Sequence, residues 1–172
     1  MKTDTIFYRL FQTFPQTLFE LLQISPQFAQ NYRFDSVEVK QLSFRLDGVF
    51  LPTVTDAPIY FVEVQFQPDN TFFARLLSEI FLYLYRSDLD SDWRGVVIFP
   101  NRRVDNSPKT RYSEFFESGR ITPLYLDELD ETLQSTPLLA TVGLVTAPKS
   151  QAIEQAQDLI ERVRVEVEVR FV

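Results

Sequence analysis

Glu63 and Gln65 lie inside an otherwise apolar and aromatic run, PIYFVEVQFQP, that extends from Pro58 to Pro68. The β-branched and aromatic residues of this run are typical of a central strand. Because side chains two positions apart lie on the same face of a strand, Glu63, Gln65 and Gln67 share one face. The spacing therefore gathers polar side chains at one end of that face.

A second acidic residue, Asp47, belongs to the preceding segment, where it shares a strand face with Arg45. Pairing the two segments around a turn at Pro52–Pro58 would bring Asp47 close to Glu63. Two carboxylates a few ångströms apart repel each other unless a cation lies between them. Since Mg²⁺ and Mn²⁺ prefer oxygen ligands, the pattern permits a divalent metal site built on this pair.

A simpler interpretation of the same residues stays open. Glu63, Gln65 and Gln67 fit the solvated face of a half-exposed sheet, and on the pattern alone this is the more common situation. Asp47 beside Gly48 likewise fits a turn, because both residue types are favoured there. Spacing alone therefore does not decide between a solvated strand face and a metal site.

Composition excludes several classes of active site. The chain of 172 residues has no His and no Cys, which excludes thiol chemistry, a Ser-His-Asp triad and the usual structural zinc sites. Its four glycines form neither of the glycine-rich phosphate-binding motifs. The net charge of −7 opposes contact with nucleic acid unless positively charged residues cluster locally. Such a cluster lies in the segment Asn101–Arg120.

Hydrophobic periodicity predicts alternating helices and strands. Residues 5–23 follow helix periodicity, and Pro15 is expected to divide or bend this helix. Residues 37–51 fit a long strand or a hairpin that bends at Gly48. The remaining predicted elements are helices at Phe72–Arg86, Asp127–Leu139 and Ser150–Val163, and short strands at Gly95–Pro100 and Ile121–Leu126. The alternating tail RVRVEVEVRFV fits either a strand or a continuation of the last helix.

The predicted elements follow one another in this order: a helix, FRLDGVF on a strand, a turn, PIYFVEVQFQ on a second strand, and the helix FFARLLSEIFLYLYR. This order resembles the core of the PD-(D/E)XK nuclease superfamily. More narrowly, it resembles the branch of recombination-promoting nucleases and transposase-like proteins, with related uncharacterised cyanobacterial proteins. The resemblance covers residues 1–130 or so, and it implies an α/β fold with a restriction-endonuclease-like core, a mixed central sheet flanked by helices.

The resemblance also implies roles for individual residues. Asp47 and Glu63 would be acidic metal ligands, the backbone carbonyl of Val64 would be a further ligand, and Gln65 would stand where most members have Lys. Members often add an acidic residue from the first helix, for which Glu20 is the candidate. Glutamine is neutral and can only orient groups by hydrogen bonds, whereas Lys stabilises negative charge on the attacked phosphate. The catalytic residues would be Asp47, Glu63 and Gln65, and the cofactor Mg²⁺ or Mn²⁺.

The function implied by the resemblance is that of a metal-dependent DNA endonuclease that hydrolyses phosphodiester bonds, linked to recombination or mobile elements. The neutral Gln65 and the acidic net charge leave an alternative open, a catalytically weak or inactive nuclease-fold interaction module. We expect one domain over residues 1–172, with the core at about 1–130 and a C-terminal helix and tail at 150–172. We also expect a cytoplasmic protein without a membrane span, with DNA as its partner and a homodimer as one option for its assembly.

Overall fold

The computed structural model describes residues 3–35, 38–39, 44–45, 48–147 and 149–170. The chain divides into two compact units, with the boundary between Tyr125 and Leu126. The predicted core, which ended near residue 130, is close to the first of these units. The prediction of a single domain stays a prediction, and each unit is described by itself below.

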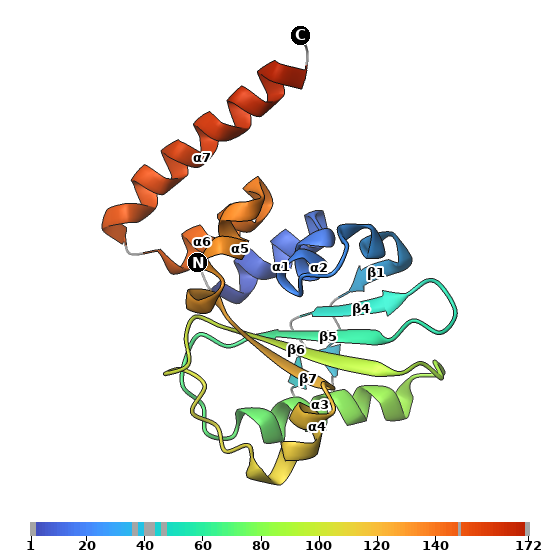
Figure 1. Cartoon of the computed structure of the whole chain (residues 1–172). Coiled ribbons are helices and arrows are strands. Elements are labelled where there is room, and N and C mark those ends of the chain that lie inside the picture. The colour runs from blue at the N-terminus through green and yellow to red at the C-terminus, as the bar shows by residue number, and fades with distance from the viewer. Residues whose placement is uncertain (1–2, 36–37, 40–43, 46–47, 148, 171–172) are drawn as a thin grey trace. The chain divides into compact units, whose positions relative to one another are not determined.

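The first unit is built on a mixed five-stranded sheet in the order β1-β4-β5-β6-β7 (Figure 1). The pairs β1–β4 and β4–β5 are antiparallel, and the pairs β5–β6 and β6–β7 are parallel. The strands are β1 (Tyr32–Asp35), β4 (Gly48–Pro52), β5 (Ile59–Val64), β6 (Trp93–Phe99) and β7 (Ile121–Tyr125). A separate two-stranded sheet pairs β2 (Glu38–Val39) with β3 (Phe44–Arg45).

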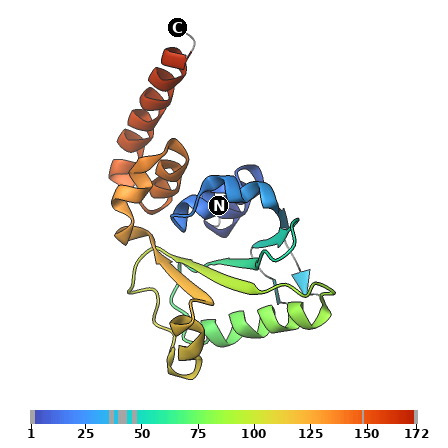
Figure 2. The same cartoon turned by 45° about the vertical axis from the view of Figure 1, so that its right-hand side comes forward.

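Helices cover both faces of the five-stranded sheet, as the views in Figures 1 and 2 agree. One face carries α1 (Thr3–Thr13) and α2 (Gln16–Leu21), followed by the 3-10 helix η1 (Pro26–Asn31). The other face carries α3 (Phe72–Arg86), with the 3-10 helix η2 (Thr110–Tyr112) and α4 (Ser113–Glu117) nearby. The predicted α/β class, with a mixed sheet between helices, is confirmed.

Aromatic rings join α2 to its face of the sheet. The ring centroid of Phe19 lies 5.1 Å from that of Tyr32, 5.9 Å from that of Phe50 and 5.7 Å from that of Tyr60. The contacts with Phe50 and Tyr60 are edge-to-face, an arrangement that is favourable beyond the area it buries. Of the two alternatives predicted at Pro15, a divided and a bent helix, the divided one is observed, and α2 directs Phe19 at the sheet.

The alternate residues of β5 face α3. Phe61 is fully buried, and its ring lies 5.3 Å from that of Tyr83 on α3. Since side chains two apart share a strand face, Glu63 also faces α3. The apolar stripe of α3 completes this core through Phe72, Phe73, Leu76, Leu77 and Ile80, all buried.

The second unit is helical. It contains the 3-10 helix η3 (Leu126–Glu128), α5 (Asp130–Ser135), α6 (Pro137–Thr146) and α7 (Lys149–Arg170). The helix predicted at Asp127–Leu139 is interrupted because Thr136 caps α6, its Oγ1 accepting a hydrogen bond from the Leu139 N–H at 3.2 Å. Of the two alternatives for the tail, the helical one is observed as far as Arg170. Among the described residues, no helix has both the length and the apolarity needed to cross a membrane.

Burial of the tyrosines under α2 predicts a loss of stability at high pH. Desolvation, with a smaller contribution from Tyr60, raises the pKa of Tyr32 from 10.0 to about 12. Its neutral form therefore stabilises the fold below pH 10.0, and this contribution is lost as the pH rises towards about 12. We expect the free energy of unfolding, measured by urea denaturation, to fall by about 2 kcal/mol over this window because of Tyr32.

Tyr32→Phe should reduce this pH dependence, whereas Tyr85→Phe, at a side chain that is 85% exposed, is the matched control. Equal pH dependence in wild type and Tyr32→Phe would contradict the assignment.

Candidate functional site

Glu63 is a buried carboxylate near the carboxyl end of the central strand β5. The residue is 5% exposed, and its Cα partner on β6 is Val97. On the other side, Val62 pairs with Gly48, the first residue of β4. A carboxylate in such a position is costly unless a cation or hydrogen-bond donors compensate it. The sequence alone did not distinguish this buried position from a solvated strand face.

Arg75 on α3 is the cation that lies against this carboxylate. Its Nη1 is 3.4 Å from Oε1 of Glu63 and 3.5 Å from Oε1 of Glu79, one turn further along α3. Its Nη2 is 3.6 Å from Oδ2 of Asp69, in the loop before the helix. One guanidinium thus lies among three carboxylates, which leaves an excess of negative charge. We call these four residues the Arg75 cluster.

The electrostatics of the cluster follow from burial and proximity. Burial on its own would lower the pKa of Arg75, but the charges of Glu63, Glu79 and Asp69 outweigh it, and the pKa lies above its ordinary value. The pKa of Asp69 is lowered chiefly because its carboxylate accepts hydrogen bonds from the hydroxyl and backbone N–H of Thr71. Asp69 is therefore fixed at the start of α3, and Arg75 is firmly cationic.

Gln65 follows the end of β5 on the same side as Glu63. Its backbone N–H donates to the carbonyl of Ile98 at 2.9 Å, so the pairing with β6 continues past Val64. Its side-chain amide donates to the backbone carbonyl of Gln67. Glu63 and Gln65 therefore lie at the carboxyl end of a strand, the edge at which open α/β sheets bind ligands.

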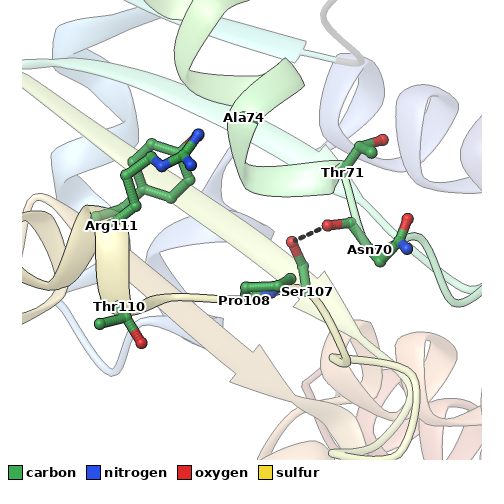
Figure 3. Close-up of a pocket in the computed structure, with 8 residues that line it drawn as sticks. Asn70, Thr71, Ala74, Ser107, Pro108, Thr110 and Arg111 are labelled. Carbon is green, nitrogen blue, oxygen red and sulfur yellow. Dashed lines mark hydrogen bonds between the residues drawn. The ribbon is translucent and has the colours of Figure 1, made fainter.

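A pocket of about 680 Å³ adjoins the first turn of α3 (Figure 3). Its wall on the helix side includes Thr71 and Ala74, and Arg111 contributes a guanidinium from the segment opposite. Asn70, Ser107, Pro108, Thr110 and Tyr112 complete the lining. Ala74 immediately precedes Arg75, so the pocket and the Arg75 cluster are built on the same turn of α3.

Polar contacts fix the segment that closes this pocket. The Ser107 hydroxyl donates to the carbonyl of Asn70 at 3.3 Å and accepts from the Phe73 N–H at 3.4 Å. The side chain of Asp105 is buried, and its carboxylate accepts hydrogen bonds from Lys109 and from the hydroxyl of Tyr125. These contacts tie the segment to both α3 and β7.

Comparison with known proteins shows the family of the chain. Residues 3–171 match the model of a family described as "Protein of unknown function (DUF2887)". The chain belongs to the DUF2887 family. No curated protein and no solved structure matches it.

The structure of this DUF2887 protein places only some of the predicted site residues. Glu63, Val64 and Gln65 are consecutive at the end of β5, whereas Asp47 lies outside the described residues. Glu20 is half-buried on α2, which packs on the face of the sheet opposite to α3, so the sheet separates it from the face of Glu63. Within the described ranges, no group of three or more Asp or Glu side chains is placed to hold a metal ion.

Sequence reasoning missed two partners of Arg75 in the DUF2887 protein, Glu63 and Asp69. The spacing of Arg75 and Glu79 indicates an ordinary ion pair across one helical turn, and that pair is present. The contact of Arg75 with Glu63 spans a strand and a helix, and nothing in the local pattern signals it. The excess of charged residues on an otherwise apolar helix was the one available hint.

The Arg75 cluster predicts a large effect of removing its cation. Arg75→Met leaves the buried carboxylates of Glu63 and Glu79 without the guanidinium, and we expect the free energy of unfolding to fall by about 2–4 kcal/mol. Adding Glu79→Gln should recover part of this loss, because one buried charge is removed. Urea denaturation measures both. Arg33→Met, at an exposed side chain on β1, should stay within about 0.5 kcal/mol of wild type; an equally small effect of Arg75→Met would contradict the account.

Proposed function

We propose that this DUF2887 protein is a Mg²⁺-dependent DNA endonuclease with a restriction-endonuclease-like core, linked to recombination or mobile elements. One observation carries the proposal: the acidic residue of the ExQ sequence is a buried carboxylate at the carboxyl end of a central strand. A polar, solvated strand face, the simpler interpretation of the same pattern, does not describe a residue that is 5% exposed. Buried charged groups in proteins are paired with an opposite charge or bind a metal ion.

The residues present suit a magnesium ion by their chemistry. Glu63 supplies a carboxylate and Val64 a backbone carbonyl, both hard oxygen donors of the type that Mg²⁺ and Mn²⁺ prefer. In the proposal Asp47 supplies the second carboxylate. The strand register supports this role. Asp47 directly precedes Gly48 in the chain, and the Cα partner of Gly48 on β5 is Val62, the residue before Glu63. Glu20 gains no support from the position of α2 and is not needed.

The proposed reaction is hydrolysis of a phosphodiester. The oxygen of a water molecule bonds to phosphorus and that water gives up one proton to solvent. The bond from phosphorus to one sugar oxygen breaks, and that oxygen leaves with a proton taken from solvent. A bound Mg²⁺ would supply charge stabilisation at a phosphoryl oxygen and lower the pKa of water. Gln65 would orient the water or the phosphate through its amide, since a neutral side chain can act only by hydrogen bonding.

Exposed cations without a carboxylate partner are the first candidates for contact with DNA. Arg103 and Arg111 are exposed, and the described part of the chain gives neither side chain a carboxylate partner. Lys109 and Arg120, by contrast, pair with Asp105 and Asp92. We propose that Arg103 and Arg111 contact the phosphate backbone beside the site, which answers the objection raised by the net charge of −7.

The second candidate function is an interaction module without catalysis. The observation that favours it is the Arg75 cluster, in which a guanidinium already compensates Glu63 without a metal ion. The two proposals make opposite predictions for DNA cleavage.

Cleavage of a supercoiled plasmid tests the nuclease. We expect nicking by wild type in Mg²⁺ or Mn²⁺ that stops in EDTA, and a rate at least about 100-fold lower in Glu63→Gln and in Asp47→Asn, because each variant loses a ligand charge while keeping its shape. Asp88→Asn, at an exposed carboxylate beyond the end of α3, is the control and should cleave normally. Cleavage by Glu63→Gln at the wild-type rate would remove the site, and no cleavage by wild type would favour the interaction module.

Salt dependence of DNA binding tests the exposed arginines. In Arg103→Gln with Arg111→Gln, affinity for a short duplex should fall for every sequence, and the slope of log affinity against log salt should decrease by about two, one for each arginine that no longer neutralises a phosphate. Fluorescence anisotropy across a KCl series measures it. Arg33→Gln, which removes an exposed cation on β1, is the matched control. If the double variant has the same slope as wild type, DNA binds to another surface.

A further inference from the structure

We propose that the guanidinium of Arg75 provides the positive charge that stabilises the attacked phosphate. The neutral side chain of Gln65 is unsuited to this role. This inference rests on the proposed nuclease function. Hydrolysis of a phosphodiester builds negative charge on the phosphoryl oxygens, and a fixed cation beside them lowers the barrier. The position of Arg75 against the proposed metal ligand makes it the candidate for this charge.

Proximity is the first argument. Nη1 of Arg75 is 3.4 Å from Oε1 of Glu63, so a phosphate that approaches this carboxylate through a metal ion also approaches the guanidinium. Gln65 is closer in sequence to Glu63, but its amide is neutral and is engaged with the carbonyl of Gln67. The cationic contact at this edge of the sheet therefore comes from the helix and not from the strand.

Restraint of the side chain is the second argument. Glu79, which is 1% exposed, holds Nη1 from one side at 3.5 Å, and Asp69 lies 3.6 Å from Nη2 on the other. The guanidinium carbon also lies 5.4 Å from the ring centroid of Phe72. A side chain held in this way loses little further freedom when it binds a phosphate, and this is the condition for electrostatic stabilisation of a transition state.

Access and spare donors are the third argument. The Arg75 side chain is 32% exposed, although both of its glutamate partners are buried. Its hydrogen bonds to these glutamates both leave from Nη1, and Nη2 lies 3.6 Å from Oδ2 of Asp69, so the remaining ones of the five guanidinium N–H groups can serve another acceptor. Arginine with adjacent donors suits the paired oxygens of a phosphate. A purely structural ion pair would not require this exposure.

Binding without metal provides a test that does not depend on turnover. The variants of Arg75 are made in a protein that also carries Glu79→Gln. Removal of Arg75 then does not leave the buried carboxylate of Glu79 without its partner. In Arg75→Met with Glu79→Gln, the slope of log duplex affinity against log KCl, measured in EDTA, should be smaller by about one than in Glu79→Gln alone. Arg75→Lys in the same background should keep the slope, and Arg33→Gln should keep that of wild type. An unchanged slope in the Arg75→Met pair, with a normal circular dichroism spectrum, overturns the proposal.

Plasmid nicking in Mg²⁺ provides the second readout. The Arg75→Met pair should lose about 10²–10³-fold in rate relative to Glu79→Gln, and Arg75→Lys should recover most of the loss. If wild type cleaves and the double variant Arg75→Met with Glu79→Gln cleaves as fast as Glu79→Gln alone, the proposed role of Arg75 is wrong. The proposed nuclease function is then retained. If wild type does not cleave but the slope falls as stated, the nuclease is wrong and Arg75 stands as a phosphate contact.

Discussion

The buried carboxylate of Glu63 is the constraint on which the candidate site depends. A carboxylate removed from water at the end of a central strand must be compensated, and Arg75 does this from the helix that crosses over the sheet. The same contact determines what the site can do. It places a cation against the acidic group, and it leaves that cation shared among three carboxylates, an arrangement that another positive ion would relieve.

The fold explains why these groups meet. β5 is central because β4 pairs with it on one side and β6 on the other, and its alternate residues face α3. The loop from Gln65 to Thr71 returns the chain at once to the start of α3, so Arg75 comes back over the end of the strand that the chain has just left. Asp69 and Ser107 fix the first turn of α3 from two different segments. The cluster is thus local in space although it joins a strand, a loop and a helix.

Much of this architecture could be predicted from the sequence. Periodicity located α3 at its observed bounds, and the helix break at Pro15 and the strands β5, β6 and β7 were predicted to within a few residues. β1 was missed because four residues, YRFD, are too short for a periodic signal, and α4 because five residues in a polar segment look like a loop. The buried state of Glu63 was not predictable, since only the packing of α3 distinguishes it from the solvated face of a strand. The pairing with Arg75 depends on the same tertiary contact.

The central claim is that Glu63 is a ligand for a divalent cation as well as the partner of Arg75. Calorimetric titration of Mn²⁺ into the metal-free protein tests it most directly, with Glu63→Gln beside Glu79→Gln, a second buried glutamate of the same cluster. The account predicts binding by wild type that is lost in Glu63→Gln and retained in Glu79→Gln. Equal Mn²⁺ affinity in wild type and Glu63→Gln, or no binding by wild type, would contradict it.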